Sequence, residues 1–439
     1  MRNTLIVLLC IFMISIGYTQ SIDTNRLDIY FNTLESNDKL MGSIAIFQES
    51  EIIYNKQIGF TDVATQIKPD INTKYRIGSI SKSFTAVLIF KAIEQDNIIL
   101  SETIDKYYPT IKNAKKITIS DLLNHRSGIH SFTDNKKEYL SYRTQPKSEI
   151  EMVEIVSKYD SDFEPNTKGT YSNSNYLLLS YILEKVFNKP FAQILKDEIC
   201  TPLKLEYTYF GELISIDSNE AYSYRFDKNW QKEEQTNGTA GMGAGSIVST
   251  PTDLIKFADA VFNGRIISKR SLEQMKTIRD NFGMGLFKTP YYDLVSYGHN
   301  GGIDGFMSML RYFPNEKMGF ALTANAVDYN FNSIETIIAK SLLNKHFDIP
   351  IFSIYKPSSK ELKKYLGVYS SETFPVKITV TKPKSHLVLI IANQESIHLD
   401  AFRKGKFKFD PAGIVIEFIT SKNEMWIKQG GKVNVLKKE

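Results

Sequence analysis

The decisive stretch of this chain reads Arg76-Ile77-Gly78-Ser79-Ile80-Ser81-Lys82-Ser83-Phe84. It places Ser79 and Lys82 three residues apart at a point where a helix is expected to begin. Residues at this spacing lie on one face of a helix, so the Lys82 amine can reach the Ser79 hydroxyl. The same spacing occurs at residues 36–39 and 353–356, but those pairs lack the apolar run that follows Ser79 over residues 84–93. This run predicts a buried helix whose first turn faces a cleft.

This residue pair has the chemistry of an activated nucleophile. A serine hydroxyl attacks a carbonyl only when a neighbouring base removes its proton. A lysine amine serves as that base when burial or nearby cations lower its pKa. The backbone N–H groups of a helix start also favour developing negative charge, as on the oxyanion of a tetrahedral intermediate. One short segment is therefore expected to supply a nucleophile, a base and part of an oxyanion site.

Residues 1–19 have the features of a signal peptide. One basic residue, Arg2, precedes an apolar run over residues 5–16 and a small-residue ending at 17–19. The alternative is an uncleaved amino-terminal anchor, but the run is shorter than the roughly 20 residues that span a bilayer. Cys10 lies too early in the run for a lipoprotein cleavage site. We expect a periplasmic or secreted protein with no stable membrane span after cleavage.

Length and composition exclude several classes of protein. The chain has 439 residues, more than a single core usually supports, so two domains are expected. The net charge of +5 is spread without a basic run, so no nucleic-acid partner is expected. Cys10 would leave with the signal peptide, and Cys200 is predicted to be a small buried apolar residue. No H-x-x-x-H or C-x-x-C spacing indicates a metal site, and no cofactor is expected.

The hydrophobic pattern indicates an α+β fold. The middle of the chain, residues 79–262, is dominated by helical patterns, whereas strand patterns lie on both sides of it. These flanking elements are a hairpin over 42–56, strands at 294–297, 306–313 and 319–324, and a helix over 334–343. The pattern predicts one antiparallel sheet built from both ends of the domain, with helices packed on it and a helical lobe beside it.

The pattern of apolar and polar residues changes at about residue 350. From there to the end, short segments alternate between apolar and polar residues and are separated by turns. We therefore expect a larger α+β domain over residues 20–348 and a small, barrel-like, all-β domain over residues 349–439. The alternation leaves no polar cluster, so the second domain is interpreted as a scaffold or capping module.

Two further segments have the composition of an active site. Tyr171-Ser172-Asn173 lies in a loop of the helical lobe, where the phenol can relay a proton and the Asn173 amide can hold Lys82 or a substrate carbonyl. His299-Asn300-Gly301-Gly302 closes a strand pattern, and glycines in a strand mark a close approach of backbone or ligand. The Gly302 N–H is a candidate oxyanion donor beside that of Ser79. The alternative for this segment is a glycine-rich hairpin with a surface histidine.

The three segments, in this order, resemble the three active-site motifs of serine β-lactamase-like hydrolases. This family includes penicillin-binding DD-peptidases, class C β-lactamases, D-aminopeptidases and related esterases. Segments 121–129 and 240–250 also resemble it, and the resemblance covers residues 25–347. It implies that Ser79 is the acyl-forming nucleophile, Lys82 its general base, Tyr171 the acid/base for the leaving group and Asn173 an orienting amide. His299 is implied to line the pocket.

The chain departs from class C β-lactamases at the third motif. Those enzymes usually carry lysine and threonine at the positions of His299 and Asn300, and the fixed positive charge attracts the substrate carboxylate. Histidine is mostly neutral at pH 7, so peptidase or esterase activity is favoured over potent β-lactam hydrolysis. The resemblance also implies structural roles for His125 and His130, and deacylation through Tyr171 or Lys82.

The sequence therefore predicts an exported serine hydrolase that forms an acyl-enzyme on Ser79. Its substrate would be a small molecule or peptide with an amide or ester bond, such as a D-amino-acid peptide, an ester or a β-lactam, and a peptidoglycan-derived molecule is one candidate. The alternative is a non-catalytic protein that keeps the fold and binds peptidoglycan or a peptide. Specificity is expected to depend on the loops over 139–147 and 211–239. The oligomeric state is left open.

Overall fold

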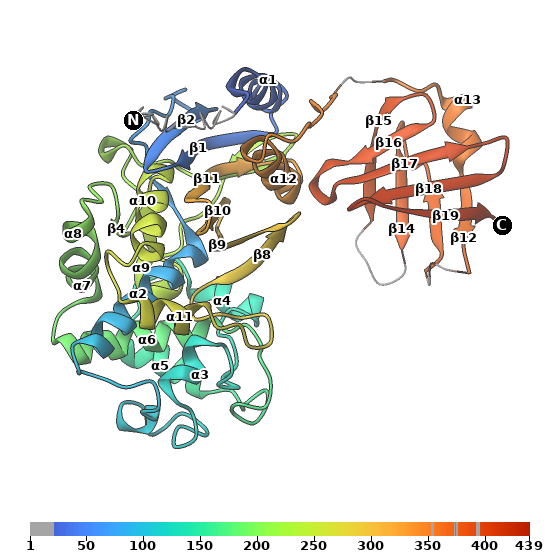
Figure 1. The fold of residues 1–439 in the computed structure, drawn as a ribbon. Helices are drawn as coiled ribbons and strands as arrows, with labels where there is room; N and C mark the ends of the chain where they lie inside the picture. The colour runs from blue at the N-terminus through green and yellow to red at the C-terminus, as the bar shows by residue number, and fades with distance from the viewer. Residues whose placement is uncertain (1–21, 353–354, 373, 375, 392–395) are drawn as a thin grey trace, which may run out of the picture.

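The computed structural model describes residues 22–352, 355–372, 374, 376–391 and 396–439. Figure 1 shows a larger domain, in which helices surround a sheet, and a smaller β domain at the carboxyl end. The signal peptide predicted at residues 1–19 lies outside the described residues. Within them, no helix is both long and apolar enough to cross a bilayer.

The larger domain is organised around one antiparallel sheet made from both ends of the chain, as predicted. Its main path follows the order β2-β1-β11-β10-β9-β8. The strands are β1 (Leu40–Gln48), β2 (Glu51–Ile58), β8 (Phe287–Tyr291), β9 (Leu294–Ile303), β10 (Phe306–Phe313) and β11 (Met318–Val327), with β5 (Tyr224–Asp227) and β6 (Asn229–Lys232) attached beside β11.

Alternating side chains of the central strands bury both faces of this sheet. On β10, Met309 and Phe313 belong to the core beneath α1 (Thr24–Glu35) and α12 (Phe331–Leu342). Leu310 and Tyr312, on the opposite face, belong to the other core, beneath α10 (Pro251–Phe262). A strand buried on both faces is expected to be mostly apolar, and this agrees with the composition of 306–313 and 318–326, whose few polar side chains are themselves buried.

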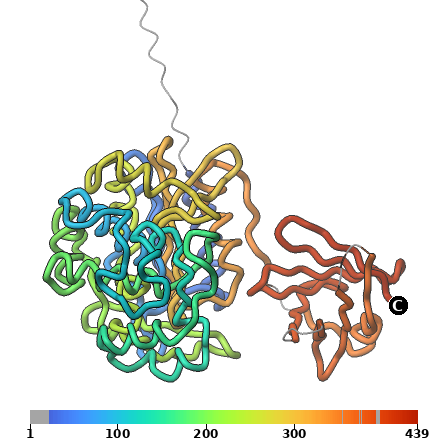
Figure 2. Tube along the Cα trace, turned by 90° about the horizontal axis from the view of Figure 1, so that it is seen from below, coloured from blue at the N-terminus to red at the C-terminus, as the bar shows by residue number. Residues whose placement is uncertain are grey.

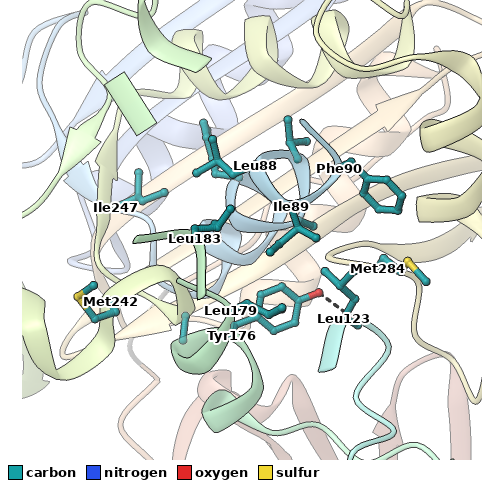
Figure 3. Close-up of a cluster of buried hydrophobic side chains, with 14 of the residues drawn as sticks. Leu88, Ile89, Phe90, Leu123, Tyr176, Leu179, Leu183, Met242, Ile247 and Met284 are labelled. Carbon is teal, nitrogen blue, oxygen red and sulfur yellow. Dashed lines mark hydrogen bonds between the residues drawn. The ribbon is translucent and has the colours of Figure 1, made fainter. Parts of the chain in front are cut away.

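The helical lobe is built around α2 (Ser81–Glu94). Figure 3 shows Leu88 and Ile89 of α2 close to Leu179 and Leu183 of α6 (Asn173–Phe187). Tyr176 brings a hydroxyl into this core, and the hydroxyl donates a hydrogen bond of 2.8 Å to the Leu123 carbonyl. Because α2 is buried on nearly all sides, its first turn is held rigidly.

The remaining elements of the larger domain are short. Three small strands, β3 (Tyr75–Arg76), β7 (Ile247–Ser249) and β4 (Tyr209–Phe210), form a separate sheet in the order β3-β7-β4. The other helices are α3 (Ile119–Leu123), α4 (Lys136–Tyr142), α5 (Glu149–Ser157), α7 (Phe191–Leu195), α8 (Thr201–Leu203), α9 (Gly238–Gly241) and α11 (Lys269–Lys276). Cys200 is buried as predicted, and burial raises the pKa of its thiol to about 12.

Three element boundaries differ from the sequence predictions. Ser79 lies in a 3₁₀ turn, Gly78–Ile80, and the α-helix begins only at Ser81. Asn173 is the first residue of α6 rather than part of the preceding loop. Strand β9 continues to Ile303, so the His299-Asn300-Gly301-Gly302 segment lies inside the strand. The extension could not be recognised from period-two alternation, because glycines carry no side chain that would mark one face of the strand.

The smaller domain is a closed barrel of β12 to β19 in chain order, which confirms the prediction of a small, barrel-like, all-β domain. Its core contains Phe407, Ile416, Met425 and Leu436. Figure 2 shows the barrel beside the larger domain, joined to it by the segment after α12. The strands are β12 (Gly367–Ser370), β13 (Ile378–Thr381), β14 (Leu387–Ile391), β15 (Ile397–Arg403), β16 (Lys406–Phe409), β17 (Ile414–Ile419), β18 (Glu424–Gln429) and β19 (Lys432–Lys438), preceded by the short helix α13 (Ser359–Leu362).

Candidate active site

A cavity of about 480 Å³ lies where the helical lobe meets β9. Three of the residues singled out in the sequence, Ser79, Asn173 and Gly302, line it although they are far apart along the chain. The other lining residues include apolar side chains from the helical lobe and from β10, namely Phe132, Tyr139, Leu140, Phe306 and Met307. Such a mixture of apolar walls and a few polar groups is typical of a small-molecule site.

Lys82 is fully buried beneath this cavity. Its Nζ atom lies 3.0 Å from Ser79 Oγ, 2.8 Å from Asn173 Oδ1 and 2.6 Å from the Ala244 carbonyl oxygen. No ion pair among the described residues involves Lys82. Burial without a carboxylate partner lowers the pKa of Lys82 well below its ordinary value of 10.5.

The contacts of Lys82 fit a neutral amine. A neutral amine has two N–H groups and one lone pair. The two N–H groups can donate to Asn173 Oδ1 and to the Ala244 carbonyl, both of which only accept. The lone pair then faces Ser79, whose hydroxyl can donate its proton to it. In its neutral form, which burial favours, Lys82 is therefore placed to act as a general base toward Ser79.

Asn173 is oriented by contacts on its own side of the cavity. Its Nδ2 group donates a hydrogen bond of 2.8 Å to Thr133 Oγ1, so its Oδ1 atom is the one directed to Lys82. Its backbone N–H donates to Ser131 Oγ at 3.1 Å, which fixes the first turn of α6 against the preceding loop. Asn173 is therefore placed to hold the amine of Lys82, the first of the two roles expected for it.

Tyr171 lies beside the same lysine. Its ring centre is 4.9 Å from Lys82 Nζ. Burial raises the pKa of Tyr171 above its ordinary value, and the nearby Ser79 hydroxyl only partly offsets this effect. Tyr171 therefore remains a protonated phenol at neutral pH and has a proton to give to a leaving group.

His125 supports Tyr171 from behind, a contact that the sequence did not predict. The two rings stack with centres 4.5 Å apart. His125 Nδ1 accepts a hydrogen bond of 3.1 Å from the Ser172 N–H, and burial lowers the pKa of His125 well below its ordinary value. In the sequence, the only indication of a role for His125 is its place in the 121–129 segment, which resembles the family. His130 lies elsewhere, with Nδ1 2.9 Å from an Asp162 carboxylate oxygen.

His299 is buried in β9 and is not among the residues that line the cavity, in contrast to the expectation. Its ring lies between those of Phe287 and Tyr171, with centre distances of 4.7 and 6.2 Å. Nδ1 lies 2.5 Å from the Asn300 carbonyl oxygen and donates to it. Burial lowers the pKa of His299 to about 3, so the ring is neutral. Asn300 itself is exposed.

Two glycines allow β9 to lie directly against the 3₁₀ turn that carries Ser79. A Cβ atom on Gly301 would lie 1.9 Å from the Ile77 carbonyl oxygen, and one on Gly78 would lie 2.6 Å from the Gly302 nitrogen. Gly78 also has a φ of +50°, a conformation that favours glycine. Ser79 and Gly302 both line the cavity, so their N–H groups are candidates for paired donors to an oxyanion.

The structure describes no metal site near these groups. Over the residues described, no cluster of three His, Cys, Asp or Glu side chains is arranged to hold a metal ion. The groups that it does bring together are the Ser79 hydroxyl, the buried amine of Lys82 and the phenol of Tyr171, with Ser79 and Gly302 lining the cavity. These are the groups needed for acyl transfer through a serine nucleophile.

The acylation rate of Ser79 by a fluorophosphonate should rise with pH and then level off, because only neutral Lys82 can accept the serine proton. The midpoint should lie well below 10.5, the ordinary pKa of a lysine. His299→Gln should keep this rise of the rate with pH (the acidic limb of the profile), since His299 is already neutral above about pH 5. Labelling rates measured across the pH range test this. A variant that lost the limb would identify His299, not Lys82, as the titrating group.

Gly301→Ala should lower the rate of Ser79 labelling about 100-fold, because the added Cβ would force β9 away from the nucleophile. The neighbouring Gly302→Ala is the matched comparison, since its Cβ would meet only the Phe306 carbonyl oxygen at 4.0 Å. Gly302→Ala should lose far less of the labelling rate than Gly301→Ala. Labelling kinetics and a thermal melt of both variants measure this contrast, and equal losses would show that the close approach has no special importance.

Comparisons with known proteins identify a matching family and several relatives. Residues 33–344 match the family model described as Beta-lactamase. Penicillin-binding protein 4* of Bacillus subtilis (strain 168) is 25% identical over 429 residues, which cover 90% of this chain and 93% of that protein. A teichoic acid D-alanine hydrolase of Staphylococcus aureus (strain MRSA252) is 27% identical over 301 residues, covering 67% of this chain and 72% of that protein.

Solved structures share the fold. The octameric penicillin-binding protein homologue from Pyrococcus abyssi has a TM-score of 0.69 at 23% identity and covers 95% of this chain and 100% of its own. A D-amino acid amidase from Ochrobactrum anthropi SV3 has a TM-score of 0.65 at 23% identity, with coverages of 73% and 99%. The family model spans well over half of the chain and includes all three motifs. The resemblance predicted from those motifs is confirmed, and the chain belongs to the β-lactamase family of serine hydrolases.

Proposed function

We propose that this protein hydrolyses ester or amide bonds of D-aminoacyl compounds through an acyl-enzyme on Ser79. The observation that carries this proposal is the contact between Ser79 and a buried lysine with no carboxylate partner. A protonated lysine at this position could not activate the serine, whereas a neutral one can. The substrate class is suggested by the relatives, whose names include a teichoic acid D-alanine hydrolase and a D-amino acid amidase.

In the proposed acylation, Lys82 takes the hydroxyl proton as Ser79 Oγ attacks the carbonyl carbon. The oxyanion that forms accepts hydrogen bonds from the Ser79 and Gly302 N–H groups. When the bond to the leaving group breaks, the Tyr171 phenol donates its proton to the departing oxygen or nitrogen and recovers one from Lys82. Water then repeats the sequence on the acyl-enzyme: its proton passes to the same base, and Ser79 leaves with a proton.

The charges of the cavity favour substrates without a free carboxylate near the reacting bond. The cations among its described lining residues are Arg143 and Arg225. Arg143 Nη1 is 2.6 Å from Asp304 Oδ1, and Arg225 Nε is 2.9 Å from Glu233 Oε1, so each cation already has an anionic partner. His299 is neutral. An ester or amide of a D-amino acid therefore fits this cavity better than a peptide that ends in a carboxylate.

Export and domain organisation complete the proposal. The apolar segment at residues 5–16 supports export to the periplasm or the exterior. We assign catalysis to residues 20–348 and a separate β domain to residues 349–439, which agrees with the extent of the family match at 33–344.

Ser79→Ala should abolish labelling by a fluorescent fluorophosphonate and reduce hydrolysis of a D-alanine p-nitrophenyl ester by at least about 1,000-fold. The matched control is Ser36→Ala, which removes the exposed serine of the other described S-x-x-K sequence and should change neither result. A panel with nitrocefin and a D-Ala-D-Ala peptide should give lower kcat/KM than the ester. Unaltered labelling of Ser79→Ala would reject the nucleophile, and binding of these compounds without turnover would favour a non-catalytic protein.

A further inference from the structure

The turn between β9 and β10 contains a buried carboxylate that the mechanism above does not use. Asp304 has a side chain that is 2% exposed and a φ of +53°, which is uncommon for a residue other than glycine. It lies two residues after Gly302. A charged side chain held in the interior in an unfavourable backbone conformation persists only when the surrounding contacts compensate for it.

Those contacts come from two other segments. Arg143, which directly follows α4 of the helical lobe, donates to Asp304 Oδ1 at 2.6 Å. Thr236, in the loop before α9, donates from its backbone N–H to Oδ2 at 3.0 Å and from its hydroxyl to Oδ1 at 2.7 Å. One carboxylate therefore joins the β9–β10 turn to both walls of the cavity.

Two arginines hold the partners of Asp304 in place. The same Nη1 of Arg143 also contacts Thr236 Oγ1 and the Glu234 carbonyl, each at 3.0 Å. Arg76 donates to the Thr236 carbonyl and lies 4.0 Å from Asp304 Oδ2. Arg76 belongs to β3, two residues before Gly78, so the network also reaches the strand that leads into the Ser79 turn.

This part of β9 has little other support along its edge. Strand β8 pairs with β9 only as far as Gly298, so the edge from His299 to Ile303 faces the Ser79 turn instead of a neighbouring strand. The close contact of Gly301 with Ile77 limits how near the edge can come to the Ser79 turn. A steric contact of this kind sets a minimum distance but does not prevent the strand end from moving away. Pairing with β10 holds the opposite edge of β9 as far as Ile303, and the anchor at Asp304 fixes the turn that joins these two strands.

We propose that Asp304 is a positioning residue that fixes the Gly302 N–H in the oxyanion site through its ion pair with Arg143 and its bonds to Thr236. The inference rests on the proposed function. Donors for an oxyanion act only when they are held at hydrogen-bonding distance from the place where the charge develops. Asp304 does not touch the reacting atoms, and its contribution is to hold the strand end that carries the donor.

Asp304→Asn tests the proposal because it keeps the shape of the side chain and removes its charge. It should lower kcat/KM for an N-acetyl-D-alanine ester about 100-fold, mainly through kcat. The diagnostic readout is the same ester with sulfur in place of the carbonyl oxygen. Sulfur accepts hydrogen bonds weakly, so the thiono ester depends less on the oxyanion donors, and the oxo/thiono ratio of kcat/KM should fall about 10-fold.

Two further variants separate positioning from loss of folding. Asp328→Asn is the matched control, because Asp328 is also partly buried, with a lysine at 2.6 Å, but does not line the cavity. It should leave the ratio unchanged. Arg143→Lys keeps the charge but cannot bond in the planar geometry of a guanidinium, so it should lower the ratio to a smaller extent. Rates are normalised to the endpoint labelling of Ser79, which counts only folded protein.

The outcomes distinguish this inference from the proposed function. Turnover of the oxo ester by the unmodified protein, with labelling at Ser79, tests the function. A lower oxo/thiono ratio in Asp304→Asn and Arg143→Lys, with Asp328→Asn unchanged, supports the positioning role. Equal losses on both esters, or a change in the ratio below about 2-fold, would overturn it, because a purely structural defect reduces both reactions alike.

Discussion

The burial of one amine, that of Lys82, is the constraint on which the site depends. An ammonium group removed from water without a carboxylate partner is so costly that the proton is lost instead. The acceptors around Lys82 are uncharged, an amide oxygen and a backbone carbonyl, and both can be satisfied by a neutral amine. Placing a carboxylate there would stabilise the ammonium and remove the base. The nearly complete burial of α2 therefore has a chemical consequence, because it keeps water away from Lys82.

A second constraint is the contact between segments from opposite ends of the larger domain. Ser79 belongs to a turn that leads into the helical lobe, whereas Gly302 belongs to a strand contributed by the carboxyl end of that domain. Glycines at 78 and 301 remove the Cβ atoms that would keep these backbones apart. The interior position and neutral ring of His299 show that this strand does not present a fixed cation to the substrate. The sheet thus supplies the strand that lies against the Ser79 turn, and the helical lobe supplies the lysine that accepts the Ser79 proton.

The parts of the structure that follow from local patterns could be predicted from the sequence. The Ser79–Lys82 contact depends on one turn of backbone, the central sheet strands are mostly apolar runs bounded by turns, and the barrel strands are short and regular. The supporting contacts could not be predicted in the same way. His125 lies under Tyr171, and Asp304 meets Arg143, only because distant loops converge in space. A lone histidine or aspartate in a loop carries no periodic signal that would reveal its partner.

Direct titration of Lys82 tests the central claim. Protein labelled with ¹³C at lysine Cε can be followed by NMR as the pH is raised, with the spectrum of Lys82→Arg identifying the Lys82 resonance. The account predicts that the Cε shift changes to that of a neutral amine with a midpoint well below the ordinary pKa of 10.5. A resonance that remains that of an ammonium until the pH approaches 10.5 would contradict it.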